Sequence, residues 1–372
     1  MTVRRFSLFL VLAGLTSACS TGEPEETVPQ TPERTLIYVV NTGEPTLSVV
    51  DHETREVETL PLGAIAHGQI PSHSGEQLFV TTEDTGEVIA IDTRTQEILW
   101  RVVAVTNAGD QLHQPSLTLD DRTLFAPDAF ASRMAVVDVQ TGKNDGEVAI
   151  LDGTTRVNSL HNSYLSGDGE YFYVAGIHAQ RMAKVRVSDR EIVQMYELEG
   201  QPRPFALLSD QSRAYVQYTW LEGFVELDLE TGAELRRIDF GNAATESWDA
   251  TVTLLKPKSH GIGLTPDESQ LWATSTMADE WRVYSVPELD LVATIPIPEG
   301  NAPNWITFTP DGDFAYVSNT TFVPGEDGSP AKDVPGTVTV IDARTYEAVQ
   351  TLQVGPLPKR IHAVRVPAQG PS

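Results

Sequence analysis

The chain has 372 residues, with 52 acidic and 26 basic side chains, so its formal net charge at pH 7 is −26. A chain this acidic repels phosphate backbones and anionic lipid headgroups, which argues against nucleic acid as a partner. Its only cysteine is Cys19, so an internal disulfide framework, a multi-thiolate metal site and covalent c-type haem are all excluded.

Residues 1–18 are typical of a secretory signal peptide. Arg4 and Arg5 precede an apolar run over residues 6–15, and small residues lead to Cys19. Residues 15–19 resemble a bacterial lipobox, although the leucine lies one position farther from the cysteine than usual. The resemblance implies that Cys19 is the lipidated first residue of the mature protein. The alternative is a secreted chain with one unpaired thiol.

Residues 19–33 are rich in Pro, Glu and Thr and nearly lack large apolar side chains, so we expect a flexible tether. No later segment has the roughly 18 apolar residues needed to span a bilayer. We therefore expect a folded domain on the periplasmic side of the cell envelope, attached to the membrane only through its lipid. Ser20 stands where an aspartate would resemble an inner-membrane retention signal, which favours the outer membrane.

A register recurs from here to the C-terminus: a polar residue, which we call the ring position, lies twelve positions before an aromatic residue. Six copies are His67 with Phe79, His113 with Phe125, His161 with Tyr173, Arg203 with Tyr215, His260 with Trp272 and Asn304 with Tyr316. The seventh ring position is predicted to be His362, whose aromatic partner would be Tyr38 at the other end of the chain. The repeat therefore runs in a circle.

Each repeat has the pattern of four short strands with period-2 alternation, recurring roughly every 50 residues. This pattern predicts an all-β, seven-bladed β-propeller of four-stranded blades. Residues 360–366 would supply the innermost strand of a blade whose other strands come from residues 35–61, so pairing of the two termini closes the ring. The predicted single domain covers residues 34–367, and residues 368–372 form a tail.

The segment Tyr316-Val317-Ser318-Asn319 and the segments 258–267 and 306–312 resemble the recurring phrases of the YVTN, or YncE-like, family of β-propellers. The resemblance spans the whole predicted domain and implies a seven-bladed propeller. It implies no particular activity, because such propellers serve unrelated functions.

The innermost strands of a propeller border its central channel, so the ring positions are expected to surround one mouth of that channel. The long insertions at residues 240–259 and 320–336 are expected on the same face. The predicted ligand-binding residues are His67, His113, His161, Arg203, His260, Asn304, His362 and Trp305.

Three interpretations of this ring are open. The imidazoles can simply bond backbone carbonyls in a wet channel. They can hold a metal, copper or zinc, with His113, His161, His178, His260 and His362 as ligands. The haem d1 proteins resemble this chain in fold and hub histidines, which extends the second interpretation to a noncovalent haem and gives Arg203 a role beside it. The third is lactonase-like hydrolysis, as in related lactonase propellers, with His178 and Asp128 as an acid–base pair.

From the sequence we conclude that the protein is an exported, tethered binding module that presents a histidine-ringed channel face to a protein or small-molecule ligand. We expect a monomer, and no catalytic activity is assigned. The alternatives are a redox or cofactor-maturation role for a bound metal or haem, and a lactonase-like hydrolase.

Overall fold

The computed structural model describes residues 33–107, 109–241, 258–276, 278–298, 301–321 and 333–367. Every helix or strand element in these ranges is a β-strand. The predicted signal peptide, Cys19, the tether up to residue 32, the tail and most of both long insertions lie outside the described residues. No helix that is long and apolar enough to cross a membrane occurs in the described ranges.

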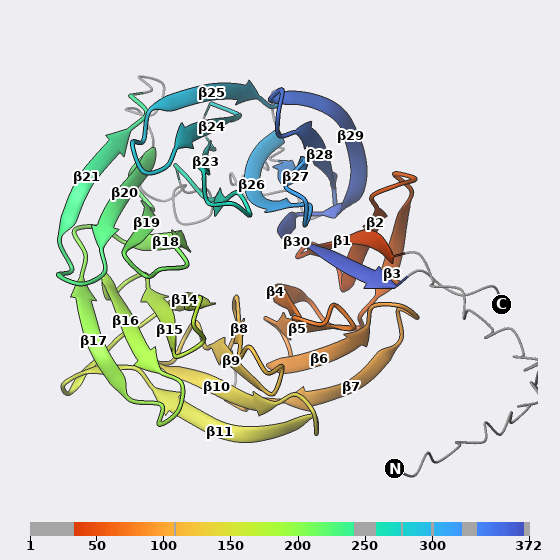
Figure 1. Ribbon diagram of the computed structural model, residues 1–372. Coiled ribbons are helices and arrows are strands. Elements are labelled where there is room, and N and C mark those ends of the chain that lie inside the picture. Colours follow the sequence, from red (N-terminus) through yellow and green to blue (C-terminus); the bar gives the residue numbers. More distant parts are fainter. Residues whose placement is uncertain are drawn as a thin grey trace, which may run out of the picture.

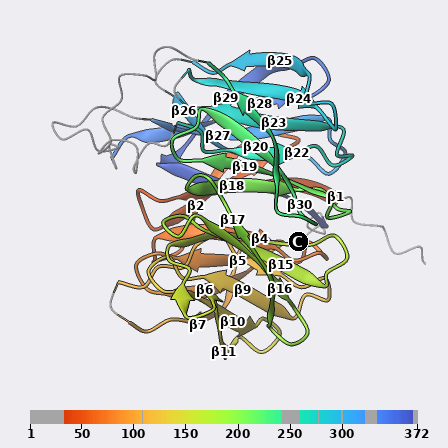
Figure 2. The ribbon, with the colours of Figure 1, turned by 90° about the vertical axis from the view of Figure 1, so that its left-hand side faces the viewer.

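Seven four-stranded antiparallel sheets surround a central axis, so the predicted all-β, seven-bladed propeller is confirmed (Figure 1). Figure 2 shows the same ring of blades from its edge. Blade 1 contains β4 (Ala66–Pro71), β5 (Gln77–Thr82), β6 (Glu87–Asp92) and β7 (Ile98–Val103). Blade 2 contains β8 (Ser116–Leu117), β9 (Thr123–Pro127), β10 (Arg133–Asp138) and β11 (Lys143–Ala149). Blade 3 contains β14 (Leu160–Leu165), β15 (Tyr171–Gly176), β16 (Arg181–Arg186) and β17 (Ile192–Glu197).

The other blades follow in chain order, and the last is shared by both ends. Blade 4 contains β18 (Pro202–Leu207), β19 (Arg213–Tyr218), β20 (Gly223–Asp228) and β21 (Glu234–Asp239). Blade 5 contains β22 (Ile262–Leu264), β23 (Gln270–Ser275), β24 (Glu280–Ser285) and β25 (Leu291–Pro296). Blade 6 contains β26 (Asn301–Phe308), β27 (Phe314–Thr321), β28 (Pro335–Asp342) and β29 (Glu347–Pro356). Blade 7 contains β30 (Pro358–Pro367), β1 (Glu33–Asn41), β2 (Thr46–Asp51) and β3 (Val57–Pro61). A small hairpin, β12 (Leu151–Asp152) with β13 (Thr155–Arg156), follows blade 2.

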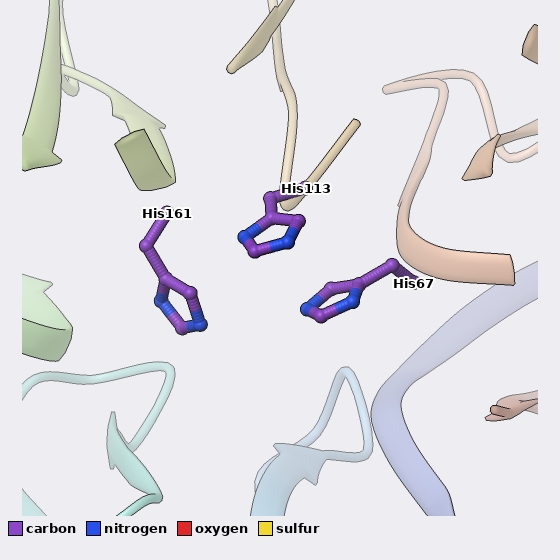
Figure 3. A group of neighbouring side chains, drawn as sticks. All are labelled: His67, His113 and His161. Carbon is purple, nitrogen blue, oxygen red and sulfur yellow. The ribbon is translucent and has the colours of Figure 1, made fainter. Parts of the chain in front are cut away.

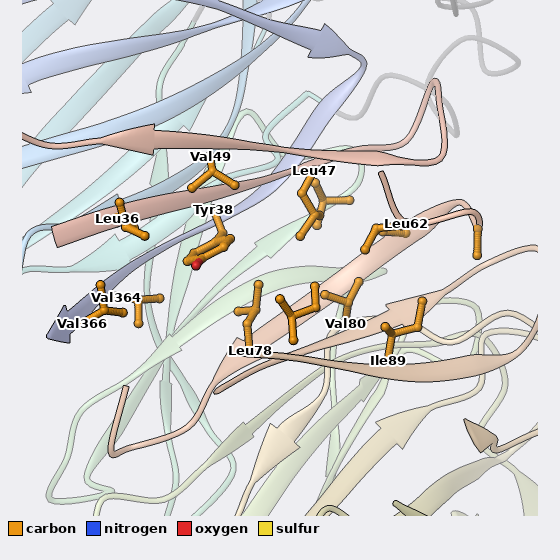
Figure 4. Close-up of a cluster of buried hydrophobic side chains, with 14 residues drawn as sticks. Leu36, Tyr38, Leu47, Val49, Leu62, Leu78, Val80, Ile89, Val364 and Val366 are labelled. Atoms are coloured by element: carbon orange, nitrogen blue, oxygen red, sulfur yellow. The ribbon is translucent and has the colours of Figure 1, made fainter. Parts of the chain in front are cut away.

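The hydrophobic core lies between neighbouring blades. The middle strands are covered on both faces, which is why β6 carries an unbroken apolar run at residues 88–91, whereas the outermost β7 buries only part of its surface. Figure 4 shows the cluster that joins blade 7 to blade 1. Its labelled members are Leu36, Tyr38, Leu47, Val49, Leu62, Leu78, Val80, Ile89, Val364 and Val366.

The N- and C-terminal strands close the ring, because β30 pairs with β1 from Glu33↔Pro367 to Asn41↔Pro358. The predicted register of this blade was wrong by three residues. In the six continuous blades, the strand aromatic pairs with the residue three positions after the ring position, as in Ile70↔Phe79 and Thr307↔Tyr316. In blade 7, Tyr38 pairs with His362 itself, so the ring position there is Lys359. A spacing along the chain cannot be counted across two separate termini, which is how the error arose.

Candidate functional site

The ring positions lie at the start of the innermost strands, where those strands depart from regular pairing. In blade 1 the ladder skips His67 between Ala66 and Gly68, and in blade 6 it skips Asn304 between Pro303 and Trp305. An irregularity of this kind redirects the side chain of the residue that it leaves unpaired. His67, His113, His161, Arg203 and His260 are all buried, and Asn304 and Lys359 are half-buried.

Three of the four ring histidines converge. His67, His113 and His161 each offer a ring nitrogen such that the three nitrogens lie within 4.8 Å of one another (Figure 3). The rings of His67 and His113 are stacked, with centroids 3.8 Å apart, and the ring of His161 stands nearly perpendicular to that of His113 at 5.1 Å. His260 lies beside this three-histidine group, with its centroid 5.6 Å from that of His161. Three neighbouring blades thus bring imidazole nitrogens close together.

A carboxylate orients one of these rings. Nδ1 of His67 lies 2.7 Å from Oε2 of Glu83, which follows β5 in the same blade. When Nδ1–H donates to Glu83, the lone pair of Nε2 is left available, and Nε2 has no hydrogen-bond partner among the described residues. Nδ1 of His113 and Nδ1 of His161 are also buried without a partner in that part of the chain. Buried polar atoms are nearly always satisfied in proteins, so these nitrogens are available to water or to a ligand.

The electrostatics of the channel keep the histidines neutral. Burial lowers the pKa of His67, His113, His161 and His260 well below its usual range, and the positive charge of Arg360 lowers each of them further. Burial, followed by the same charge, lowers the pKa of His362 to about 4. At neutral pH each of these imidazoles is therefore uncharged, with one N–H and one nitrogen lone pair, which is the form that binds metal ions.

Arg360 is the cation at the centre of this arrangement. It follows Lys359 in β30, is fully buried, and donates from Nη2 to Oδ1 of Asn162 in β14 at 2.8 Å. Its guanidinium lies 3.7 Å from the centroid of the Trp305 ring, which is buried and 5.8 Å from His260. Burial lowers the pKa of Arg360 to about 9, so it stays protonated at pH 7.

The structure separates the predicted metal ligands. His113 and His161 belong to the three-histidine group, and His67, which was predicted only as a ligand-binding residue, joins them. His260 and His362 lie outside that group; His362 is three residues past the ring position of its strand. His178 is exposed and lies 2.6 Å from Oγ of Ser159.

Other predicted residues have structural partners. Arg203 donates from Nε to Oγ1 of Thr219 at 2.8 Å, and burial lowers its pKa to about 10. Asp128, predicted to work with His178, accepts instead from Nε of Arg133 at 3.1 Å.

The roles of Asn162, Lys359 and Arg360 were not predicted from the sequence. Glu83 was predicted on the histidine-bearing face as a carboxylate that could complete a metal's ligand shell, whereas in the structure it bonds Nδ1 of His67. Lys359 and Arg360 had no signal in the repeat, because their register depends on pairing between the two ends of the chain.

Comparison with known families and structures gives two family matches. The family model PQQ_2, described as outer membrane protein assembly factor BamB, matches residues 20–238. The family model described as lactonase, 7-bladed beta-propeller, matches residues 250–320. No curated protein matches the chain.

Solved structures share the fold at low identity. Dihydro-heme d1 dehydrogenase NirN, in complex with DHE, is 16% identical with a TM-score of 0.59 over 88% of this chain and 74% of that chain. Hydrazine synthase of Kuenenia stuttgartiensis is 16% identical with a TM-score of 0.56 over 75% of this chain and 76% of that chain. These similarities support the propeller fold alone.

Proposed function

This chain belongs to the PQQ_2 family, described as outer membrane protein assembly factor BamB, and with that membership as the premise we propose that it is a binding propeller of the cell envelope whose channel holds a transition-metal ion. His67, His113 and His161 would be the ligands. The observation that carries the proposal is the convergence of three buried imidazole nitrogens within 4.8 Å of one another.

The spacing of these nitrogens suits a single ion. Two nitrogens bound to one tetrahedral ion at their usual distances are about 3.4 Å apart. The three side chains would rotate to reach one coordination sphere, and the stacked rings of His67 and His113 would tilt apart so that both lone pairs meet the ion. Three imidazoles suit copper or zinc, and they leave a coordination position open for a further ligand. Glu83 would act as the hydrogen-bonded carboxylate that orients His67, as such groups do for ligating histidines elsewhere.

The geometry favours an ion over the other interpretations. A noncovalent haem takes one or two axial side chains rather than three neighbouring imidazoles. NirN, solved in complex with DHE, has the same fold, but 16% identity carries no cofactor over to this chain. The hydrolytic alternative relied on His178 and Asp128, whose partners are Ser159 and Arg133. A wet channel would satisfy these nitrogens with water, but it gives no reason for three of them to lie within 4.8 Å of one another.

The test is metal content and metal affinity. Residues 20–372 would be exported to the periplasm of a host supplied with copper and zinc, purified, and analysed by mass spectrometry for bound metal. We expect one ion per chain, lost when His113 and His161 are both changed to Ala and retained in the matched control His178→Ala. A metal-free protein that also fails to bind added copper or zinc would refute the proposal, as would full binding by the double variant.

The attachment to the envelope is a separate part of the proposal. We propose that Cys19 is lipidated and holds a monomeric propeller at the outer membrane, where a protein or small-molecule partner would meet the channel face. Metabolic labelling with a fatty acid should mark the wild-type chain and leave Cys19→Ser unmarked. Recovery of both proteins in the soluble periplasmic fraction would contradict the anchor.

A further inference from the structure

The hub of this acidic protein is positively charged. The chain as a whole carries a formal charge of −26. Around the three-histidine group, however, the charges that act on the imidazoles are mostly cationic: Arg360 acts on all three, and Lys359 on His67 and His113. Glu83, which lies 2.7 Å from Nδ1 of His67, is the carboxylate that opposes these two cations, and it acts on His113 as well. A metal ion bound to neutral imidazoles would therefore enter a site that already repels positive charge.

Arg360 is held in this position by contacts on opposite sides of the hub. It starts in blade 7, and its side chain reaches Asn162 in blade 3, next to ring position His161. Its guanidinium also lies against Trp305 in blade 6. On the main-chain side, Nε2 of Gln69 in blade 1 donates to the Arg360 carbonyl at 3.3 Å. The residue thus contacts blades 1, 3 and 6 from blade 7, and its guanidinium is held by Asn162 and Trp305.

Arg360 forms no ion pair with a carboxylate of the described residues, although the charge of Glu83 acts on it and raises its pKa. Its Nε and Nη1 have no hydrogen-bond partner, and Nη2 bonds a neutral amide. A buried cation that makes no ion pair is costly. The cation–π contact with Trp305 offsets part of that cost without removing the positive charge.

We infer that Arg360 makes the three-histidine site selective for monovalent copper over divalent ions. This inference rests on the proposed metal-binding function. The repulsion between two charges scales with their product, so Arg360 opposes a divalent ion twice as strongly, in free energy, as a monovalent ion at the same point. Imidazole binds both copper and zinc, so in this site the charge of the ion, rather than the donor atom, discriminates. Arg360 would act on the ion only through its charge, because it donates no ligand atom.

The experiment compares two ions in four proteins. Zinc affinity would be measured by competition with a chromophoric chelator, and Cu(I) affinity by anaerobic competition with bicinchoninate. The proteins are wild type, Arg360→Gln, Arg360→Lys and the matched control Arg365→Gln, which removes an exposed arginine from the same strand. Thermal melting would establish that each is folded.

We expect Arg360→Gln to raise zinc affinity by a larger factor than Cu(I) affinity. If Arg360→Gln raises zinc affinity tenfold, which is about 1.4 kcal/mol, Cu(I) affinity should rise only about threefold. Arg360→Lys keeps the charge and Arg365→Gln leaves the hub intact, so both should resemble wild type. The copper reduction potential should fall in Arg360→Gln, because the site then tolerates Cu(II) better.

Equal rises for both ions, or the same rise in Arg360→Lys, would overturn the inference while leaving the metal site in place. Absence of any metal binding in wild type would instead refute the proposed function, and the inference with it. If Arg360→Gln does not fold, Lys359→Gln removes a half-buried hub charge and should show the same unequal rise. An equal rise for both ions in that variant would likewise overturn the inference.

Discussion

The two ends of the twelve-residue register, the strand aromatic and the ring position, differ in how their polar atoms are used. At the aromatic end, Tyr38 donates to the Thr93 carbonyl at 3.1 Å and Tyr173 to Gln211 at 3.1 Å, so hydroxyl groups of one blade bond the next. At the ring end, imidazole nitrogens of His67, His113 and His161 are buried without partners. Tyr215, whose hydroxyl is unpaired, departs from this pattern.

The difference separates stability from binding within one repeated unit. A satisfied hydroxyl adds roughly 1 kcal/mol to stability, whereas an unpaired buried polar atom costs a comparable or larger amount. The aromatic ends therefore join the blades, and the ring ends carry a cost that a bound ligand can offset. Changes at the aromatic end should therefore alter stability, and changes at the ring end should alter binding.

The largest effect should follow from removing the strand that closes the ring. Deleting residues 360–372 takes away most of β30, which pairs with β1 and buries Ile361, Val364 and Val366. We expect the chain not to fold, because blade 7 loses its innermost strand and the cluster shown in Figure 4 is opened. Circular dichroism and thermal melting would measure this, with deletion of residues 368–372 as the control. Unchanged melting of the longer deletion would contradict the closure.

Truncating the strand aromatic should lower the free energy of unfolding by less than the loss of the strand does, but the decrease should still be large. Tyr38→Ala removes a fully buried ring from the cluster between blades 7 and 1 and leaves a cavity. We expect the free energy of unfolding to fall by about 3–5 kcal/mol, and Tyr38→Phe, which loses only the hydroxyl bonds, to cost about 1 kcal/mol. Urea unfolding would measure both variants. Equal costs would show that the bond to Thr93, rather than packing, dominates.

The ring end should make the stability of the metal-free protein depend on pH. Burial lowers the folded-state pKa of His113 and His161, so below the unfolded-state value of about 6.5 the unfolded chain binds more protons than the folded chain. Stability should therefore be full above pH 7 and fall as the pH drops below about 6.5. The slope is about 1.4 kcal/mol per pH unit for each histidine that stays neutral.

Urea unfolding at pH 7.5, 6.0 and 5.0 would test this slope. Changing His113 and His161 to Gln should reduce the slope of the unfolding free energy against pH by the contribution of two histidines. The exposed His178→Gln should leave this slope unchanged. Parallel slopes in wild type and the double variant would mean that these imidazoles are protonated in the folded protein.

The smallest effect on stability should come from a ring histidine at a pH where it is neutral. At pH 8, His113→Gln should change the free energy of unfolding of the metal-free protein by less than about 1 kcal/mol, because Nδ1 of His113 makes no hydrogen bond that could be lost. The same change should weaken copper and zinc binding strongly. Titration calorimetry and urea unfolding of one preparation would measure both. A large loss of stability with unchanged metal binding would reverse the contrast between the two ends.

The sequence by itself determined the architecture and most of the ring. Period-2 alternation and turn signals act over a few residues, and a polar residue twelve positions before an aromatic repeats within one blade, so His67, His113 and His161 could be placed at one mouth from spacing alone. The closure by both termini followed because one blade lacked its innermost strand.

Only the tertiary structure decided which ring residues meet and what acts on them. The replacement of His362 by Lys359 at the ring position depends on pairing between strands from opposite ends of the chain. The convergence of three imidazoles depends on side-chain directions and on Glu83, and Arg360 reaches Asn162 across more than half of the sequence. Contacts of this kind form across the hub between separate blades. Local sequence patterns do not predict these contacts, because strand periodicity specifies which face a side chain occupies and not which distant residue it contacts.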